Sequence, residues 1–187
     1  MKESSPAPHF HYLLHPYSTC MVTCCNPKAE TNIIAIAWLI PLSAEPPLVG
    51  MSIRPTRHSY QFICEIGEFV VNVAPYELAE QALICGRRSG RDLDKFAATG
   101  LTAGKAKQVQ PPIIEECSAF IECRVVDNIE AGDHHLIIGE VLAAYAKAEA
   151  LEEGGLRALD RAPPLLHIGG NRFTSTRNEV VEPRLPT

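Results

Sequence analysis

Apolar residues occur along this chain in short runs that are separated by turn-forming residues, and long helical stripes are scarce. Such runs, rich in β-branched side chains, predict strands at residues 17–24, 32–39, 48–53, 68–73, 118–127 and 134–144. Asn26, Pro27 and Lys28 predict a turn that joins the first two strands into a hairpin. Gly139 lies inside the last strand and predicts a bulge or a close approach of another group.

Helical segments are predicted as insertions between these strands. Thr56 is a suitable N-cap for a helix that ends at Gly67, Pro75 opens a second helix, and Asp92 caps a short third helix over residues 93–98. Strands with occasional helices, without regular strand–helix alternation, favour a mainly β chain built as an antiparallel barrel. A doubly wound parallel sheet is the weaker alternative, because no strand is followed by a glycine fingerprint for dinucleotides.

The start of the first predicted helix carries groups that suit an anion. Its first turn holds Arg57, His58 and Ser59, where unpaired N–H groups and the positive end of the helix dipole face outward. This combination predicts a phosphate site, although a polar first turn with an ordinary solvated arginine is the plainer interpretation. The one tight cationic group, Arg87, Arg88 and Arg91, is large enough for a single phosphate.

Composition narrows the class of protein. The chain has 187 residues, 46% hydrophobic content and a net charge of −5, which suits one globular domain and argues against a nucleic-acid partner. The longest apolar run is too short to span a bilayer and no export signal is visible, so we expect no membrane partner and a cytoplasmic location. We divide the chain into an N-terminal arm, residues 1–16, and a single domain, residues 17–187.

Cysteine and histidine offer further chemistry. Seven cysteines cannot all pair within one chain, and no C-x-x-C occurs, so we expect reduced core cysteines in a reducing compartment. Thiol redox chemistry at Cys20, Cys24 or Cys25 is the alternative. The arm contains His9, His11 and His15 without a nearby carboxylate or cysteine, so we predict no metal site.

Five segments in order resemble the flavin reductase-like family of FMN-binding split barrels, which includes the flavoredoxins. They are NIIAIAW (32–38), PPLVGMSIRPTRHS (46–59), EFVVN (68–72), CGRRSGRDLDKF (85–96) and DHHLIIGEV (133–141). The resemblance implies a split β-barrel of Greek-key, antiparallel type, a homodimer, and FMN bound non-covalently at the subunit interface.

The resemblance also implies roles for individual residues. Ala35, Ile36, Ala37 and Trp38 would run beside the isoalloxazine ring; Ser52, Arg54 and Thr56 would line the ribityl chain and pyrimidine edge; Arg57, Ser59, Ser89, Gly90, Asp92 and Lys95 would belong to the phosphate end. Asn32 and Ile53 would also bind the cofactor. His134 would sit near the reactive face. His134 and His135 are adjacent in a strand, so they face opposite ways and at most one reaches the flavin. Without the resemblance, Trp38 could be a core residue and Lys95 a surface charge.

An FMN-dependent oxidoreductase is the function that this pattern favours. The cofactor carries the hydride chemistry and the protein supplies orientation and electrostatics, so the absence of a catalytic triad is no obstacle. NADH or NADPH would be the donor, with an electron-carrier protein as the other possible partner. The alternative is a flavin- or haem-binding split barrel without turnover, acting as a sensor or carrier.

Overall fold

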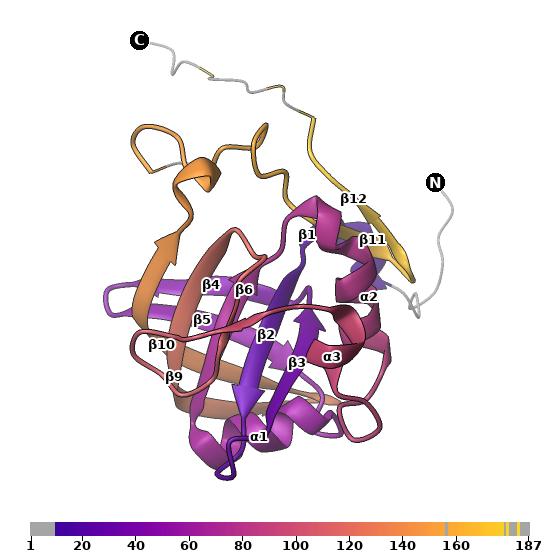
Figure 1. The fold of residues 1–187 in the computed structure, drawn as a ribbon, viewed down its shortest axis with the longest axis vertical. Coiled ribbons are helices and arrows are strands. Elements are labelled where there is room, and N and C mark those ends of the chain that lie inside the picture. The colour runs from indigo at the N-terminus through magenta and orange to yellow at the C-terminus, as the bar shows by residue number, and fades with distance from the viewer. Residues whose placement is uncertain (1–9, 156, 178, 180–182, 184–187) are drawn as a thin grey trace.

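A seven-stranded antiparallel sheet forms the body of the molecule. The computed structural model describes residues 10–155, 157–177, 179 and 183. In the sheet the strands follow the order β3-β2-β6-β9-β10-β5-β4 (Figure 1). Their bounds are β2 Cys20–Cys25, β3 Thr31–Ile36, β4 Leu39–Ala44, β5 Pro47–Ile53, β6 Glu68–Val73, β9 Ala119–Ala131 and β10 His134–Ala146. Every neighbouring pair is antiparallel, as the strand pattern predicts for a split barrel.

Both faces of the central strands are covered. All six residues of β2 are buried, and alternate side chains enter two different cores. Val22 packs with Phe69 inside the barrel, whereas Met21 packs on the other face with Leu78 and Phe120. This double burial explains why β2 and β3 are apolar almost throughout, with no clear alternation of polar residues.

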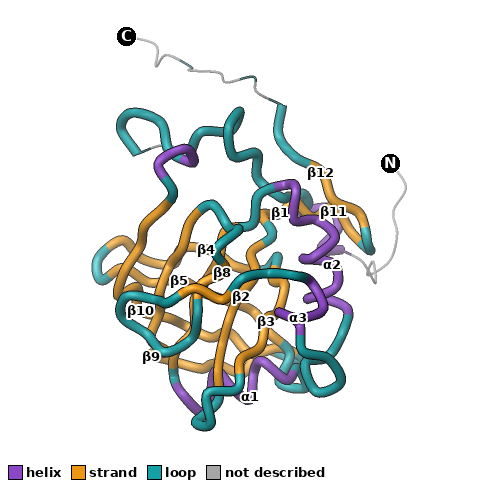
Figure 2. The backbone as a smooth tube through the Cα atoms, viewed as in Figure 1, coloured by secondary structure: helices purple, strands orange, loops and turns teal. Residues whose placement is uncertain are grey.

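Three α-helices close one end and one side of the barrel. Helix α1, His58–Ile66, crosses the lower end in Figure 1, while α2, Ala79–Arg87, and α3, Lys95–Thr99, lie beside β3. A 3-10 turn, η2, Tyr76–Leu78, precedes α2. Helices are thus insertions on a β framework, which the tube in Figure 2 shows directly.

Smaller elements complete the surface. A three-stranded sheet joins β1, Tyr17–Ser18, to the hairpin of β11, Leu166–Gly169, and β12, Arg172–Thr174. The others are η1 Phe10–Leu14, β7 Ala103–Gly104, β8 Ile113–Ile114 and η3 Ala148–Ala150. The three-stranded sheet brings the two ends of the described chain together, because Tyr17 pairs with His167.

Two predicted helix caps were wrong. Arg57, not Thr56, occupies the N-cap of α1, and its side chain makes no capping hydrogen bond. Asp94, not Asp92, caps α3 by accepting a hydrogen bond from the backbone N–H of Ala97. The predicted end at Gly67 is confirmed, since this residue adopts a left-handed conformation with φ of 73°.

The predicted strands agree with most of the observed sheet, but the predicted bounds of the second strand were wrong. The expected strand over residues 32–39 ends at Ile36, and a separate strand, β4, begins at Leu39. Gly139 is confirmed as a bulge site, because the β9–β10 register shifts there. A β-carbon on Gly139 would lie 2.6 Å from the ring of Phe69, so glycine is required by close packing.

No helix among the described residues is long and apolar enough to cross a membrane. The cytoplasmic location stays a prediction.

Candidate functional site

Two connected cavities open where β3, β5 and α2 meet. The first, which we call the large cavity, measures about 350 Å³ and runs along β3 and β5 below η1 and the β11–β12 hairpin. The second, which we call the cationic cavity, measures about 100 Å³ and lies at the N-terminus of α1. Both cavities are lined by Ile34, Arg57, Gly86 and Arg87, so they form one elongated site.

A strip of small residues forms one wall of the large cavity. Ala35 and Ala37 line it with only a methyl group each, Ile36 lies between them and packs into the barrel core, and the wall ends at Trp38. The backbone N–H of Ser52 donates to the carbonyl oxygen of Trp38 at 2.9 Å, which joins this wall to β5. The small side chains of Ala35 and Ala37 leave room for a flat ring against this wall.

Aromatic rings gather at the mouth of the large cavity. The indole of Trp38 lies 5.0 Å from the imidazole of His134, with an angle of 33° between the ring planes. His11, from η1, meets Trp38 edge-on at 5.4 Å. His15 and His167, whose rings lie 5.1 Å apart, also line the cavity. The N-terminal helix and the C-terminal hairpin therefore both contribute to the site.

Asp133 links Arg54 and His134 beside this mouth. Its carboxylate accepts from Arg54 Nη2 at 2.8 Å and from His134 Nδ1 at 2.7 Å. The hydrogen bond from His134, together with the nearby Arg54 guanidinium, lowers the pKa of the Asp133 carboxyl group. Asp133 thus stays ionised and orients His134, whose side chain is only 17% exposed.

The cationic cavity is built on buried donors. Lys95 is only 4% exposed, and its Nζ donates to the carbonyl oxygens of Ile33 at 2.6 Å and Cys85 at 2.7 Å. An ammonium group has three N–H donors, so one is left for a ligand in the cavity. Asn32 Nδ2 donates to Ser59 Oγ at 2.8 Å, and both residues are buried. Burial lowers the pKa of Lys95.

Further cations surround these donors. Arg57, Arg87 and Arg88 line the cationic cavity together with His58. Burial, followed by the charges of Arg91 and Lys95, lowers the pKa of His58. Its Nδ1 is buried and has no hydrogen-bond partner among the described residues. Such a concentration of positive charge at a helix N-terminus favours an anion with several oxygen acceptors.

Most of the predicted site residues come together here. The large cavity is lined by Ala35, Ile36, Ala37, Trp38, Ser52, Ile53, Arg54, Arg57 and His134, and the cationic cavity by Asn32, Arg57, Ser59, Ser89 and Lys95. Gly90 and Asp92 line a neighbouring open groove, and Thr56 lines none of these cavities. The carbonyl oxygen of Thr56 instead accepts from Arg91 at 3.4 Å.

His134 and His135 face opposite ways, as adjacent residues in a strand should. His135 turns away from the large cavity, and its Nδ1 lies 2.8 Å from Asn128 Oδ1 and 3.1 Å from the hydroxyl of Tyr60.

Sequence reasoning missed several lining residues. His11, His15, His167 and Gly170 reach the large cavity from the two ends of the chain, and no local motif indicates this. Arg87 was noted only as part of a cationic group, yet it lines both cavities.

The cysteines offer little redox chemistry. All seven are free, and Cys64 alone is exposed. Burial raises the pKa of Cys24 to about 12 and that of Cys20 to about 11, and it also raises the pKa of Cys25. These thiols therefore stay protonated near neutral pH and are poor nucleophiles. Among the described residues no cluster of His, Cys, Asp or Glu could hold a metal ion.

Comparison with known proteins identifies the family. A family model described as "Flavin reductase like domain" matches residues 12–176. The chain belongs to the flavin reductase-like family. A flavin reductase of Pseudomonas putida is 33% identical over 136 residues, which cover 72% of this chain and 76% of that relative.

Solved structures of flavin reductase-like proteins share the fold over nearly the whole chain. The flavoredoxin of Desulfovibrio vulgaris (Miyazaki F) is 26% identical, with a TM-score of 0.86 and 97% of each chain covered. An FMN-binding protein from Thermus thermophilus with bound 1-cyclohex-2-enone is 27% identical, with a TM-score of 0.86 and 98% of each chain covered. The split barrel expected from the sequence is therefore confirmed.

Proposed function

We propose that this protein is an FMN-binding oxidoreductase that moves electrons from NADH or NADPH to flavin, or through bound FMN in the manner of a flavoredoxin. One observation carries the proposal: a small cavity lined by the buried Lys95 and by several arginines adjoins a larger cavity that has Ala35 and Ala37 on one wall. A molecule with a phosphate at one end and a flat ring at the other matches that shape and charge. Relatives named as flavin reductase, flavoredoxin and FMN-binding protein support it.

The residues present fit FMN. Lys95, Arg57 and Ser59 would hold the phosphate, because each presents a donor or cationic group at the cationic cavity. Ala35 and Ala37 would lie against the ring without crowding it, because their side chains are single methyl groups. When bound, FMN supplies the hydride and electron chemistry, so the protein has to bind, orient and exclude water.

Trp38, His134 and Arg54 set the environment at the mouth of the large cavity. The indole of Trp38 and the imidazole of His134 cover one side of the opening, and Asp133 fixes both His134 and Arg54. Donors held in place in this way can stabilise negative charge that develops on a reduced ring, and the loss of one such donor costs about 3 kcal/mol.

A homodimer is part of the proposal. Phe10, Leu13 and Leu14 of η1 are 61%, 83% and 61% exposed, and Ile40 of β4 is 53% exposed. Phe10, Leu14 and Ile40 border an apolar cavity of about 260 Å³ that also includes Trp38 and Ser52. Apolar side chains that border one cavity favour a protein interface, and here such an interface would adjoin the cofactor site. Light scattering should give twice the chain mass, and a Leu13→Glu/Leu14→Glu variant should shift it toward the monomer.

The function is tested on the purified full-length protein. FMN titration, followed by flavin fluorescence, should give a saturable 1:1 complex per chain, and addition of NADH or NADPH should bleach the flavin absorbance near 450 nm. Steady nucleotide consumption with added free flavin indicates a reductase, and reduction of bound flavin without such turnover indicates a carrier. A protein that binds FMN but is reduced by neither nucleotide would instead be the non-catalytic flavin binder. Failure to bind FMN would overturn the proposal.

A further inference from the structure

The guanidinium group of Arg87 contacts a part of the site that lies far away in the sequence. Arg87 is the last residue of α2, and its exposed side chain lines both the large cavity and the cationic cavity. Its Nη2 donates to the carbonyl oxygen of Gly170 at 2.6 Å, in the turn of the β11–β12 hairpin. Gly170 also lines the large cavity. One side chain therefore extends from the cationic cavity to the hairpin that borders the large cavity.

The β11–β12 hairpin is attached to the rest of the domain by short elements. Its strands have four and three residues, and two residue pairs connect β11 to β1. A cavity of about 180 Å³, lined by Leu83 and Phe173 among others, lies between the hairpin and α2. Among the described residues, the bond from Arg87 to Gly170 is the one hydrogen bond that α2 makes to the hairpin. Short strands beside an unfilled space open at a low cost in free energy, so this bond matters for the position of the hairpin.

A guanidinium group can serve two partners at once. It carries five N–H donors in a rigid planar fork, and the hydrogen bond to Gly170 uses one of them. An anion in the cationic cavity can accept from another edge of the same fork. Such an anion would hold the long side chain of Arg87 in one conformation, so the bond to Gly170 would cost less side-chain entropy. An occupied cationic cavity should thus strengthen the contact with the hairpin.

We propose that Arg87 is a positioning residue that couples anion binding in the cationic cavity to closure of the β11–β12 hairpin over the large cavity. The coupling is reciprocal: an anion favours the closed hairpin, and a molecule held in the large cavity by the closed hairpin favours the anion. That the anion is the phosphate of FMN rests on the proposed function; the coupling between an anion and the hairpin does not.

The probe is inorganic phosphate, and the measurement is amide hydrogen exchange followed by mass spectrometry. Peptides that cover residues 164–176 report on the hairpin, and peptides from β2 report on opening of the whole barrel. Saturating phosphate, compared with sodium chloride at the same ionic strength, should slow exchange in the hairpin about three- to tenfold, in keeping with one net hydrogen bond. Exchange in β2 should change less, because local opening of the hairpin leaves β2 folded.

Two matched variants identify the residue responsible. Arg87→Lys keeps the positive charge but replaces the fork by one ammonium group, so it should abolish the slowing even at saturating phosphate. Arg88→Lys is the control, because Arg88 lines the cationic cavity but not the large cavity, and at saturating phosphate the slowing should persist. The inference is overturned if phosphate leaves hairpin exchange unchanged or speeds it, or if phosphate slows β2 equally. It is also overturned if Arg87→Lys responds as wild type does, or if Arg88→Lys abolishes the slowing as fully.

Flavin titration separates this inference from the proposed function. Riboflavin lacks the phosphate, so wild type should bind it about three- to tenfold more tightly in saturating phosphate, and Arg87→Lys should show no such gain. Riboflavin binding that does not respond to phosphate in wild type would contradict the coupling. If phosphate slows hairpin exchange through Arg87 while no flavin binds, the coupling stands and the proposed function fails. If FMN binds while hairpin exchange is indifferent to phosphate, the proposed function stands and the coupling fails.

Discussion

The ammonium group of Lys95 lies 2.6 Å from the carbonyl oxygen of Ile33, inside the protein and at the floor of the cationic cavity. A buried cation with two carbonyl partners and one remaining donor is an arrangement that both stabilises the fold and receives an anion. Lys95→Met should therefore lower the free energy of unfolding by about 1–3 kcal/mol and weaken FMN binding about tenfold or more. Urea unfolding and flavin titration measure the two effects.

Lys105→Met is the matched control for that variant, because Lys105 is exposed and lines none of the cavities of the site. Unchanged FMN affinity in Lys95→Met would show that the remaining donor does not reach the phosphate.

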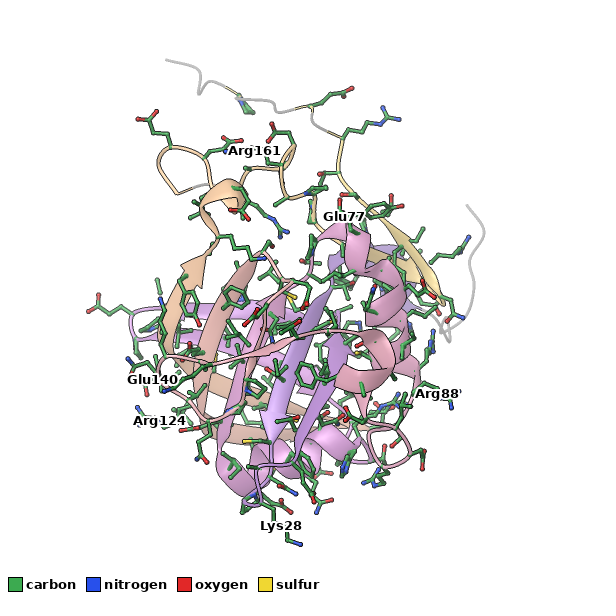
Figure 3. All side chains as sticks on the ribbon, in the orientation of Figure 1. Lys28, Glu77, Arg88, Arg124, Glu140 and Arg161 are labelled. Atoms are coloured by element: carbon green, nitrogen blue, oxygen red, sulfur yellow. The ribbon has the colours of Figure 1, made fainter. Side chains whose placement is uncertain are left out.

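Substitution of Arg57, which is exposed, tests the proposed phosphate site at its solvent-facing edge. Arg57→Ala should weaken FMN binding by about 1.5–3 kcal/mol if its guanidinium makes a charge-assisted contact with the phosphate. Arg124→Ala is the control, since Arg124 pairs with Glu140 on the side of the molecule away from Arg88 (Figure 3). FMN affinity is measured by fluorescence titration. Equal FMN affinities of the two variants would show that Arg57 does not contact the phosphate.

The close contact with Asn32 requires glycine at position 90. A β-carbon at Gly90 would overlap the side-chain amide of Asn32, which donates to Ser59 in the cationic cavity. Gly90→Ala should therefore displace Asn32 and weaken FMN binding about tenfold, a loss comparable to that of one hydrogen bond to a buried group. The double variant Asn32→Ala/Gly90→Ala has room for the added methyl group, so the two changes should be non-additive in flavin affinity. Simple additivity would contradict the contact.

His134 and His135 provide a matched pair. His134→Ala removes the ring that lies 5.0 Å from Trp38 and should slow reduction of bound FMN about 100-fold or more if this imidazole assists the reaction. His135→Ala changes a residue that faces Asn128 and Tyr60, and should leave the rate unchanged. Stopped-flow absorbance measures both rates. Equal rates for wild type and His134→Ala would assign His134 a role in packing alone.

The lowered pKa of His58 predicts that the stability of the fold depends on pH. Its pKa is lowered in the folded state by burial and then by Arg91 and Lys95. The unfolded chain therefore takes up a proton first as the pH falls below about 6.5, and the folded state loses stability in that range. His58→Gln should flatten this part of the curve of unfolding free energy against pH. Persistence of the full slope in His58→Gln would show that another group is responsible.

Local patterns were sufficient for the sheet but not for the rim of the site. Short apolar runs identified most of the barrel strands, because burial of β2 on both faces leaves a plain signal in the sequence. Strand β4 is not evident from the sequence, because Pro41 argues against a central strand; β4 is an edge strand, where proline is tolerated. Thr56 is the better N-cap by residue type, but Arg57 occupies that position and α1 begins at His58.

The lining residues from the ends of the chain could not be predicted from local patterns. His11 and His167 reach the large cavity only after β1 pairs with β11 across about 150 residues of sequence. Asn32, Ser59 and Lys95 could be proposed from a family resemblance, yet their shared burial is visible only in three dimensions. Long-range pairing, which no short segment encodes, decides these positions.

The strand order has a practical consequence for anyone preparing this protein. β3 is the edge strand on one side of the sheet, and β5 is next to the edge strand β4 on the other side. Both β3 and β5 line the large cavity, so both must be in place before the cavity exists. A chain that has folded only its hairpins offers no pocket to a chromophore. If FMN binds as proposed, the ratio of yellow colour to total protein in a preparation would count the molecules that have completed the barrel, and added FMN would protect them against heat by mass action.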